Sequence, residues 1–218
     1  TFVIANVRFE VLNRLLPFLS SAAARRTSFD LQELLERFAF DNVCKVVFNE
    51  DTAQLGDDNE HSEGRRFYRA FDQACNICVE RFKAVVPISW KLRRMFGLGL
   101  EGQLKENIKI VDEYAMRVVK SRRQAALGDD LLSRFIAEKE ENYSDQFLRD
   151  IIVSFVLAGR DTTSATLTWF FWLISTRPVV SSKIKNEIHR VRASSGTTGI
   201  FTLEQVREMN YLHAALSE

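Results

Sequence analysis

The sequence is short of the residues that make turns. It contains nine glycines and three prolines among 218 residues, about half of the usual combined share of roughly 12%. A β-sandwich or β-barrel needs a turn about every 8–12 residues, so this composition argues against both. Seventeen phenylalanines, against three tryptophans and four tyrosines, indicate a thick aromatic core. The composition predicts an all-α protein.

The sequence also contains few cysteines and has almost no net charge. Cys44, Cys75 and Cys78 are too few for a disulfide framework and indicate a reducing compartment. Thirty basic and 29 acidic residues give a net charge of +1, without the concentrated basic face that nucleic acid requires. The chain opens at Thr1 without a leader and stops at Glu218 within an amphipathic pattern. We therefore interpret residues 1–218 as a single partial domain, an internal fragment of a larger protein.

Helical spacing of apolar residues predicts one amphipathic helix after another. The first is expected over 2–19, ending around Pro17, and the second is expected to open at Asp30 with Glu33 as a capping pair. Further helices are expected at about 65–83, 101–124 and 129–140. In the 65–83 helix, the residues expected to point inward are Phe67, Phe71, Ala74, Cys78 and Phe82.

The longest predicted helix covers about 144–177. Ser144 is a suitable N-cap and Pro178 stops the pattern, which gives a rod of roughly 48 Å. The helix is apolar on nearly every side, as expected of a core or membrane helix. Its longest uncharged run, 162–176, is shorter than the ~18–20 residues of a bilayer span, so we favour a core helix.

The middle of this helix reads Ala-Gly-Arg-Asp-Thr-Thr-Ser-Ala-Thr over residues 158–166. Glycine, threonine and serine are locally costly in a helix centre, and their hydroxyls can bond the i−4 carbonyl and bend the helix. Two interpretations stay open. The segment is either a small-residue groove that carries a hydroxyl and a carboxylate, or a kinked core helix in which Asp161 pairs with Arg160 or another buried cation.

Other motifs carry less weight. Residues 97–102 satisfy G-x-G-x-x-G, but no strand pattern precedes them. Cys75 and Cys78 have C-x-x-C spacing within a helical pattern, which favours two core-facing residues over a metal or redox pair. The basic run Lys91–Arg94 beside Trp90 is better explained as a solvated turn than as a membrane contact. The three histidines lack ligand spacing; they are His61, His189 and His213.

The run Ala158–Thr163 resembles the Ala/Gly-Gly-x-Asp/Glu-Thr-Thr/Ser pattern in the distal long helix of cytochrome P450 monooxygenases. Residues 211–218 resemble the start of that family's Glu-x-x-Arg helix, with Glu218 as the glutamate. The plant fatty-acid omega-hydroxylase branch is the part of the family that the chain resembles most. The similarity lies in segments 71–82 and 90–94 and in the arginine at the variable motif position. The chain is thus similar to the central helical portion of the cytochrome P450 fold.

The resemblance implies a haem cofactor and roles for single residues. Thr162 would hydrogen-bond dioxygen or its water, and Asp161 would relay protons, which makes these two the implied catalytic residues. The residues implied to contact the cofactor are Ala158, Gly159, Thr162 and Thr166, while Glu218 has a structural role. The helices at 65–83 and 101–124, with the loop that joins them, would form a Phe-rich lid over an apolar substrate.

The departures from the family pattern are equally specific. The Phe-x-x-Gly-x-x-x-Cys loop that holds the haem-ligating cysteine is absent from this sequence, as is the upstream Trp-x-x-x-Arg. The surroundings of Cys44, Cys75 and Cys78 do not match that loop. We therefore expect no metal ligand in this chain. The iron ligand, the membrane anchor and the β region are expected outside it, and the isolated chain is expected to be inactive.

By the same resemblance, the complete protein is expected to use O2 and an NADPH-dependent reductase. Its expected substrate is fatty-acid-like, and its expected place is the cytosolic face of the endoplasmic reticulum membrane, which it would contact only through segments missing from this chain. An alternative from another class is a helical interaction scaffold without catalysis. It would explain the many helices, but not a Gly-Arg-Asp-Thr-Thr run within a core helix.

Overall fold

The computed structural model describes residues 2–56, 61–83, 99–125, 128–138, 143–196 and 199–218. Every secondary-structure element in these ranges is helical, which confirms the predicted all-α class. In chain order the elements are α1 (Phe2–Glu10), the π-helical turn η1 (Val11–Leu15), α2 (Leu16–Arg25), α3 (Leu31–Phe48), α4 (Glu63–Lys83), α6 (Leu100–Gln124), α7 (Leu131–Ala137), α8 (Asp145–Ser175), α9 (Pro178–Ser195), α10 (Leu203–Arg207) and α11 (Asn210–Ser217).

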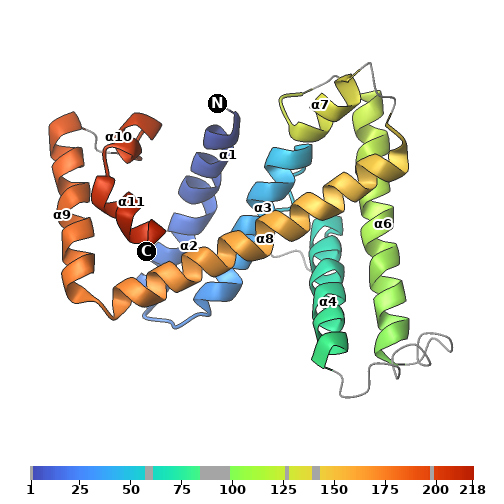
Figure 1. Ribbon diagram of the computed structural model, residues 1–218, viewed down its shortest axis with the longest axis horizontal. Coiled ribbons are helices and arrows are strands. Elements are labelled where there is room, and N and C mark those ends of the chain that lie inside the picture. The colour runs from blue at the N-terminus through green and yellow to red at the C-terminus, as the bar shows by residue number, and fades with distance from the viewer. Residues whose placement is uncertain (1, 57–60, 84–98, 126–127, 139–142, 197–198) are drawn as a thin grey trace.

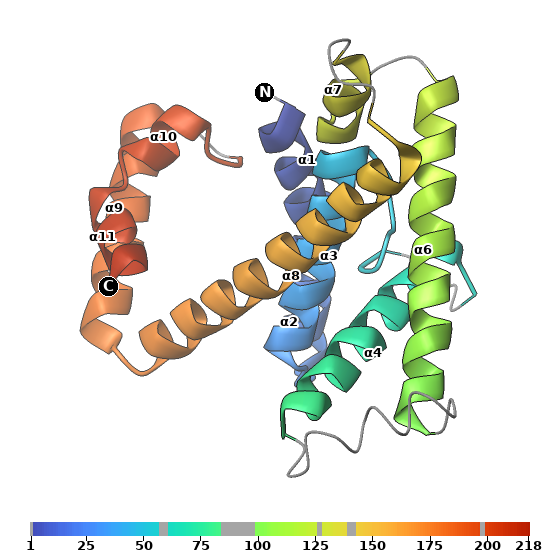
Figure 2. The same cartoon turned by 45° about the vertical axis from the view of Figure 1, so that its right-hand side comes forward.

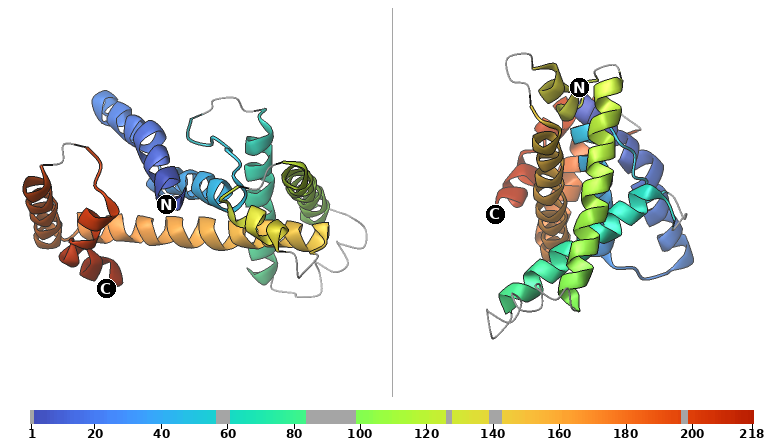
Figure 3. Two further views of the ribbon diagram at one scale, coloured as in Figure 1. Left: turned by 90° about the horizontal axis from the view of Figure 1, so that it is seen from above. Right: turned by 90° about the vertical axis from the view of Figure 1, so that its right-hand side faces the viewer.

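The long helix α8 runs through the structure and contacts helices at both of its ends (Figure 1). α3 packs against α8, and α6 packs on the N-terminal part of α8 with α4 at its side (Figure 2). α9 follows the C-terminal end of α8, and α11 folds back onto α9. Seen from above, α1, α2 and α3 lie on the same side of α8 (Figure 3).

Side-chain caps set where several helices begin. The Asp30 carboxylate accepts the backbone N–H of Glu33 at the start of α3 (3.1 Å), as predicted. The Ser144 hydroxyl accepts the backbone N–H of Phe147 at the start of α8 (3.2 Å). Each cap satisfies a donor that has no partner within its helix, which typically contributes about 1 kcal/mol. The observed bounds of α8 lie within two residues of the predicted 144–177.

The core lies where α3, α4, α6 and α8 meet. Phe40 and Phe48 of α3 and Phe67 of α4 are fully buried, and the Phe67 ring stacks on Tyr114 of α6 with 4.3 Å between centroids. α8 contributes the fully buried side chains of Leu148, Ile152 and Val156. Each large apolar side chain buried in this way contributes about 1.5–3 kcal/mol, so this aromatic core, as predicted, holds the four helices together.

Three expectations about the helices need correction. Pro17 does not end the first helix: the preceding π-turn η1 widens the backbone, and Pro17 sits in the first turn of α2, which continues to Arg25. Cys78 and Phe82 do not point inward; both are exposed, Phe82 to 92%, because α4 extends along α6 and buries Ile77 instead.

The predicted lid is also only partly as expected. Phe67 and Phe71 of α4 are packed in the core against Phe40, so they do not form an apolar surface over a substrate. The loop that joins α4 to α6 lies outside the described residues, and so do Trp90 and the basic run 91–94. None of the helices in the described ranges has an apolar stretch long enough to cross a bilayer.

A buried cluster of charges joins α1, η1 and α3 to the loop that follows α3. Arg14 donates hydrogen bonds to the carboxylates of Glu10 and Asp51, at 2.7 Å each. Asp41 of α3 lies 3.9 Å from the same guanidinium. Burial, then repulsion by Asp41, raises the pKa of Glu10 to about 7 in spite of Arg14.

We predict that this cluster makes stability pH-dependent. The folded-state pKa of Glu10 is above its ordinary value of 4.5, so the protonated form stabilises the fold fully below pH ~4.5, and that contribution is lost as pH rises through ~7. Relative to Glu10→Gln, the wild-type protein should lose on the order of 2 kcal/mol of unfolding free energy across this window.

Thermal or urea unfolding of both proteins between pH 4 and pH 8 measures this difference. Glu106→Gln, which alters an exposed carboxylate of α6, serves as the control and should follow the wild-type curve. Parallel curves for wild type and Glu10→Gln across the whole range would contradict the prediction.

Candidate active site

The centre of α8 has two different sides. Residues four apart are buried against the neighbouring helices, namely Ile152, Val156, Arg160 and Ser164. The other side carries the exposed residues Ala158, Thr162, Ala165, Thr166 and Trp169, which we call the open strip. At the centre of α8, the burial expected of a core helix is therefore found on one side only within the described ranges.

The open strip is bordered by large apolar side chains. Phe155, Leu157 and Trp172 are exposed alongside it, and Trp169 within it is 63% exposed. Contiguous exposed apolar surface of this kind is typical of a site that binds another molecule or another part of a protein. Small residues at the middle of the strip let a flat partner approach the helix backbone closely.

Thr162 and Thr166 both hydrogen-bond the helix backbone. The Thr162 hydroxyl donates to the carbonyl oxygen of Ala158 (2.5 Å), and the Thr166 hydroxyl donates to that of Thr162 (2.7 Å). These are the predicted i−4 bonds, yet α8 continues unbroken from Asp145 to Ser175 (Figure 3). With its proton committed to Ala158, the exposed Thr162 hydroxyl presents its oxygen as an acceptor to the open strip.

Asp161 combines features of both interpretations that the sequence left open. Its carboxylate lies 3.4 Å from Nε of Arg160, so the proposed pair exists. The Asp161 side chain is nevertheless 49% exposed, whereas that of Arg160 is 3% exposed. The carboxylate therefore remains in contact with solvent beside Thr162, and its pairing with Arg160 leaves it accessible to other molecules.

Arg160 is anchored on the packed side of α8. Its guanidinium donates to Asp72 of α4 in a short hydrogen bond and to Glu36 of α3 at 3.3 Å. It also lies over the ring of Tyr68, 5.1 Å from the centroid. Burial alone would lower the pKa of Arg160, but the bond to Asp72 and the neighbouring charges raise it above its ordinary value. Sequence reasoning missed both acidic partners, although a buried arginine requires them.

Gly159 faces α3 and lies outside the open strip, and its contact with the cofactor stays a prediction. A Cβ atom at this position would lie 2.8 Å from Cγ2 of Val43 in α3. Glycine is therefore needed here so that α3 and α8 can approach closely. Of the four residues predicted to contact the cofactor, Ala158, Thr162 and Thr166 lie on the exposed side, and Gly159 faces another helix.

A groove of about 680 Å³ continues from the open strip between α8, α9 and α11. Thr166, Trp169 and Glu218 line it, so the structure brings two of the predicted site residues to one cavity. The start of α11 is held by Glu187 of α9, whose carboxylate accepts the backbone N–H groups of Tyr211 and Leu212 at 2.9 Å each. Sequence reasoning also missed this cap, because no spacing rule links the two helices.

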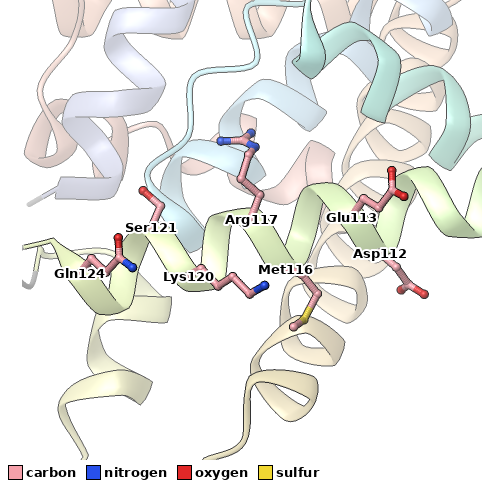
Figure 4. A pocket seen from close by; sticks show the side chains of 7 residues that line it. All are labelled: Asp112, Glu113, Met116, Arg117, Lys120, Ser121 and Gln124. Atoms are coloured by element: carbon pink, nitrogen blue, oxygen red, sulfur yellow. The ribbon is translucent and has the colours of Figure 1, made fainter.

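A second depression lies on the outer face of α6 (Figure 4). Its lining side chains all come from that one helix, and they are mostly charged or polar: Asp112, Glu113, Met116, Arg117, Lys120, Ser121 and Gln124. Arg117 already pairs with Glu63, at 3.2 Å. A surface built by one helix gives no enclosed site, and we assign it no function.

Two of the three cysteines lie where the thiolate form is disfavoured. Cys44 is fully buried, and burial raises its pKa well above the ordinary value. Burial and the Asp161 carboxylate raise the pKa of Cys75 to about 11. Cys78 is exposed on α4. The described residues also contain no cluster of three metal-binding side chains.

Comparison with known proteins identifies the chain. The family model for cytochrome P450 matches residues 4–218. The chain belongs to the cytochrome P450 family. Cytochrome P450 CYP94D108 of Paris polyphylla is 59% identical over all of the chain, which covers 44% of that protein. Cytochrome P450 94A1 of Vicia sativa is 38% identical, again over all of the chain and 41% of that protein.

Cytochrome P450 94C1 of Arabidopsis thaliana is 40% identical over 97% of the chain and 43% of that protein. The chain thus spans less than half the length of these curated relatives. The crystal structure of the cytochrome P450DA heme domain matches 88% of the chain with a TM-score of 0.69 at 20% identity, and the match covers 40% of that domain. The predicted P450 fold and the predicted resemblance to the cytochrome P450 family are confirmed.

Haem is the cofactor of this P450 family, and the open strip fits it. A flat macrocycle needs a wall of small side chains with apolar neighbours, which Ala158, Ala165 and Trp169 supply. The exposed Thr162 hydroxyl and Asp161 carboxylate add two polar groups at one turn of that wall.

We predict that Gly159→Ala destabilises this P450. Alanine improves helix propensity by about 1 kcal/mol, but its Cβ would collide with Val43, whose branched side chain is stiff. Overpacking of this kind typically costs about 1–3 kcal/mol. Unfolding free energies should therefore fall for Gly159→Ala alone.

The double variant Gly159→Ala with Val43→Ala tests the cause. Removing the two methyl groups of Val43 opens space for the new Cβ, so Gly159→Ala should be neutral or stabilising in the Val43→Ala background. If the alanine at 159 costs the same stability in both backgrounds, the close approach of α3 and α8 is not the reason for the glycine.

Proposed function

We propose that the complete protein containing this chain is a haem-thiolate monooxygenase that hydroxylates a fatty acid at or near its terminal carbon. The observation that carries the proposal is the pairing of Asp161 and Thr162 on exposed positions of α8 in a chain of the cytochrome P450 family. In the overall reaction, substrate C–H, O2, NADPH and one proton give the alcohol, water and NADP+.

The haem, bound against the open strip with a cysteine ligand from outside this chain, supplies the oxygen chemistry. Thr162 acts in this proposal as a holder of water. Because its hydroxyl proton is donated to Ala158, its oxygen accepts a hydrogen bond from a water molecule in the strip. That water is then oriented to donate its other proton away from the helix.

Asp161 supplies protons to the same place. Its side chain is half exposed, so it can exchange a proton with solvent, and it precedes Thr162 on the adjacent helix position. Each turnover releases one oxygen atom as water and so consumes two protons at the distal side. Asp161 takes a proton from bulk water and passes it to the water held by Thr162.

The substrate assignment rests on apolar surface and on relatives. Exposed Phe155, Leu157 and Trp172 flank the open strip, which suits an alkyl chain better than a polar substrate. The relatives include 94A1 and 94C1, in agreement with the resemblance to the plant fatty-acid hydroxylase branch. The core position of Phe67 and Phe71 means that the expected Phe-rich lid does not support this substrate.

The remaining parts of the proposal follow from the proposed chemistry. Two electrons per turnover must come from a donor, for which we propose an NADPH-dependent reductase. We place the complete protein at the cytosolic face of the endoplasmic reticulum membrane. Both statements rest on the family resemblance and involve segments outside this chain.

We predict that Thr162→Ala uncouples the complete enzyme. Without the hydroxyl, water at the open strip is not held for proton transfer, so NADPH is still consumed but its two electrons reduce O2 to hydrogen peroxide instead of supporting hydroxylation. Loss of one well-placed hydrogen-bonding group typically costs on the order of 10²-fold in the step it serves. The ratio of hydroxylated product to NADPH consumed measures the effect.

Thr168→Ala is the matched control, because its hydroxyl makes the same i−4 bond, to Ser164 at 2.8 Å, away from the Asp161–Thr162 pair. It should leave the ratio near the wild-type value. Asp161→Asn keeps the shape of the side chain, and it should lower the turnover rate more than the ratio of product to NADPH consumed. Equal ratios in Thr162→Ala and wild type would show that the hydroxyl is structural.

We also predict the substrate class. The complete enzyme, supplied with a reductase and NADPH, should hydroxylate medium-chain fatty acids near the terminal carbon and leave bulky polycyclic compounds unchanged. Product analysis by mass spectrometry measures both sets under the same conditions. Turnover confined to the polycyclic set would overturn the fatty-acid assignment and leave monooxygenase activity in place.

A further inference from the structure

Arg160 is shared among three carboxylates from three helices. Its side chain is 3% exposed, and it pairs with Asp72 of α4, Glu36 of α3 and Asp161 of α8 itself. The three contacts differ in kind. Nη2 donates hydrogen bonds to Asp72 and Glu36. Nε is buried, lies 3.4 Å from Asp161 and makes no hydrogen bond.

The two acids on the packed side are themselves held in place. The second oxygen of Asp72 accepts a hydrogen bond from the side-chain amide of Asn76, one turn further along α4, at 3.1 Å. The second oxygen of Glu36 accepts one from Gln32 of α3, also at 3.1 Å. Both carboxylates are therefore oriented by their own helices before they meet the guanidinium of Arg160.

This arrangement leaves the buried Nε donor of Arg160 facing the half-exposed carboxylate of Asp161. Charge-assisted hydrogen bonds are roughly twice as strong as neutral ones, so the bonds on Nη2 fix the position of the guanidinium. As long as Asp72 and Glu36 hold it, Nε attracts the Asp161 carboxylate through charge without bonding it. Asp161 is directed toward one side of the strip and keeps its contact with solvent.

We propose that Arg160 is a positioning residue of the oxygen site: Asp72 and Glu36 hold its guanidinium so that Asp161 is oriented beside Thr162 but is not captured. The proposal rests on the proton-relay role of Asp161 given under the proposed function. It adds that Asp72 of α4 determines how strongly Arg160 attracts the Asp161 carboxylate. It also assigns a role to Arg160, the arginine of the Ala-Gly-Arg-Asp-Thr-Thr run.

The test removes the charge of Asp72 without changing its shape. In Asp72→Asn the guanidinium loses one of its charged partners, so it should turn toward Asp161 and form a direct hydrogen bond to it. A crystal structure of the haem-loaded complete protein should then show the Arg160–Asp161 separation reduced from 3.4 Å to about 2.9 Å. This readout does not depend on catalysis.

The same variant should be slower in the proton-transfer step. We expect kcat for fatty-acid hydroxylation to fall roughly two- to thirtyfold, the range that mutations within a coupled network typically produce. KM should stay within about twofold, and the solvent deuterium isotope effect on kcat should rise, since proton delivery becomes more rate-limiting. A purely structural ion pair would change neither kcat nor the isotope effect.

Asp112→Asn is the matched control, because Asp112 of α6 also pairs with an arginine of α8, Arg149, at 3.5 Å. That pair lies about three turns from Arg160 along the helix, and its loss should leave the isotope effect unchanged. Arg160→Lys is a second test that retains the buried charge. Lysine has no Nε donor aimed at Asp161, so this variant should lower the ratio of product to NADPH consumed.

The outcomes separate the two proposals. If wild-type protein hydroxylates fatty acids and Asp72→Asn keeps the wild-type kcat, isotope effect and Arg160–Asp161 separation, the positioning role is wrong even if the variant is less stable. Full coupling in Arg160→Lys would overturn it as well. If the wild-type protein binds no haem or hydroxylates no substrate, the proposed function itself fails and the relay fails with it.

Discussion

The burial of the Arg160 guanidinium is the constraint on which the arrangement of α3, α4 and α8 depends. Removing a charge from water costs several kcal/mol unless partners compensate it. Here Glu36 comes from α3 and Asp72 from α4, while the ring of Tyr68 covers the guanidinium. All three helices must be in place for the charge to be satisfied. The contacts of Arg160 with Glu36, Asp72 and Tyr68 therefore favour one packing of these helices over others that would bury a similar apolar area.

That selection fixes the rotation of α8 about its own axis. With Ile152, Val156 and Arg160 turned toward α3, α4 and α6, the residues about half a turn away must face outward. The contact between Gly159 and Val43 fixes the same rotation by shape, since any larger residue at 159 would push α3 away. The outward position of Thr162 is thus a consequence of packing on the opposite side, where no reacting group lies.

The sequence predicts what depends on local rules. Capping and periodicity were enough to place α8 within two residues and to bring Thr162 and Thr166 to one side of it. Contacts between distant residues were beyond reach: Arg160 meets Asp72 and Glu36 across 88 and 124 positions of the chain. Helical spacing gives the angles between residues of one helix, but not which side a neighbouring helix will cover.

Neighbouring helix positions are about 100° apart, and this angle separates the buried Arg160 from the exposed Asp161 on α8. Arg160 points into the packed interior, where its cost is offset by fixed partners, and Asp161 points toward solvent, where a carboxylate can exchange protons. The proposed relay requires Asp161 to turn about its own bonds while its backbone is held in place by the supporting residues. Arg160 directly before Asp161 meets both requirements of that proposal, because the anchored residue and the exposed acid are neighbours on the same backbone.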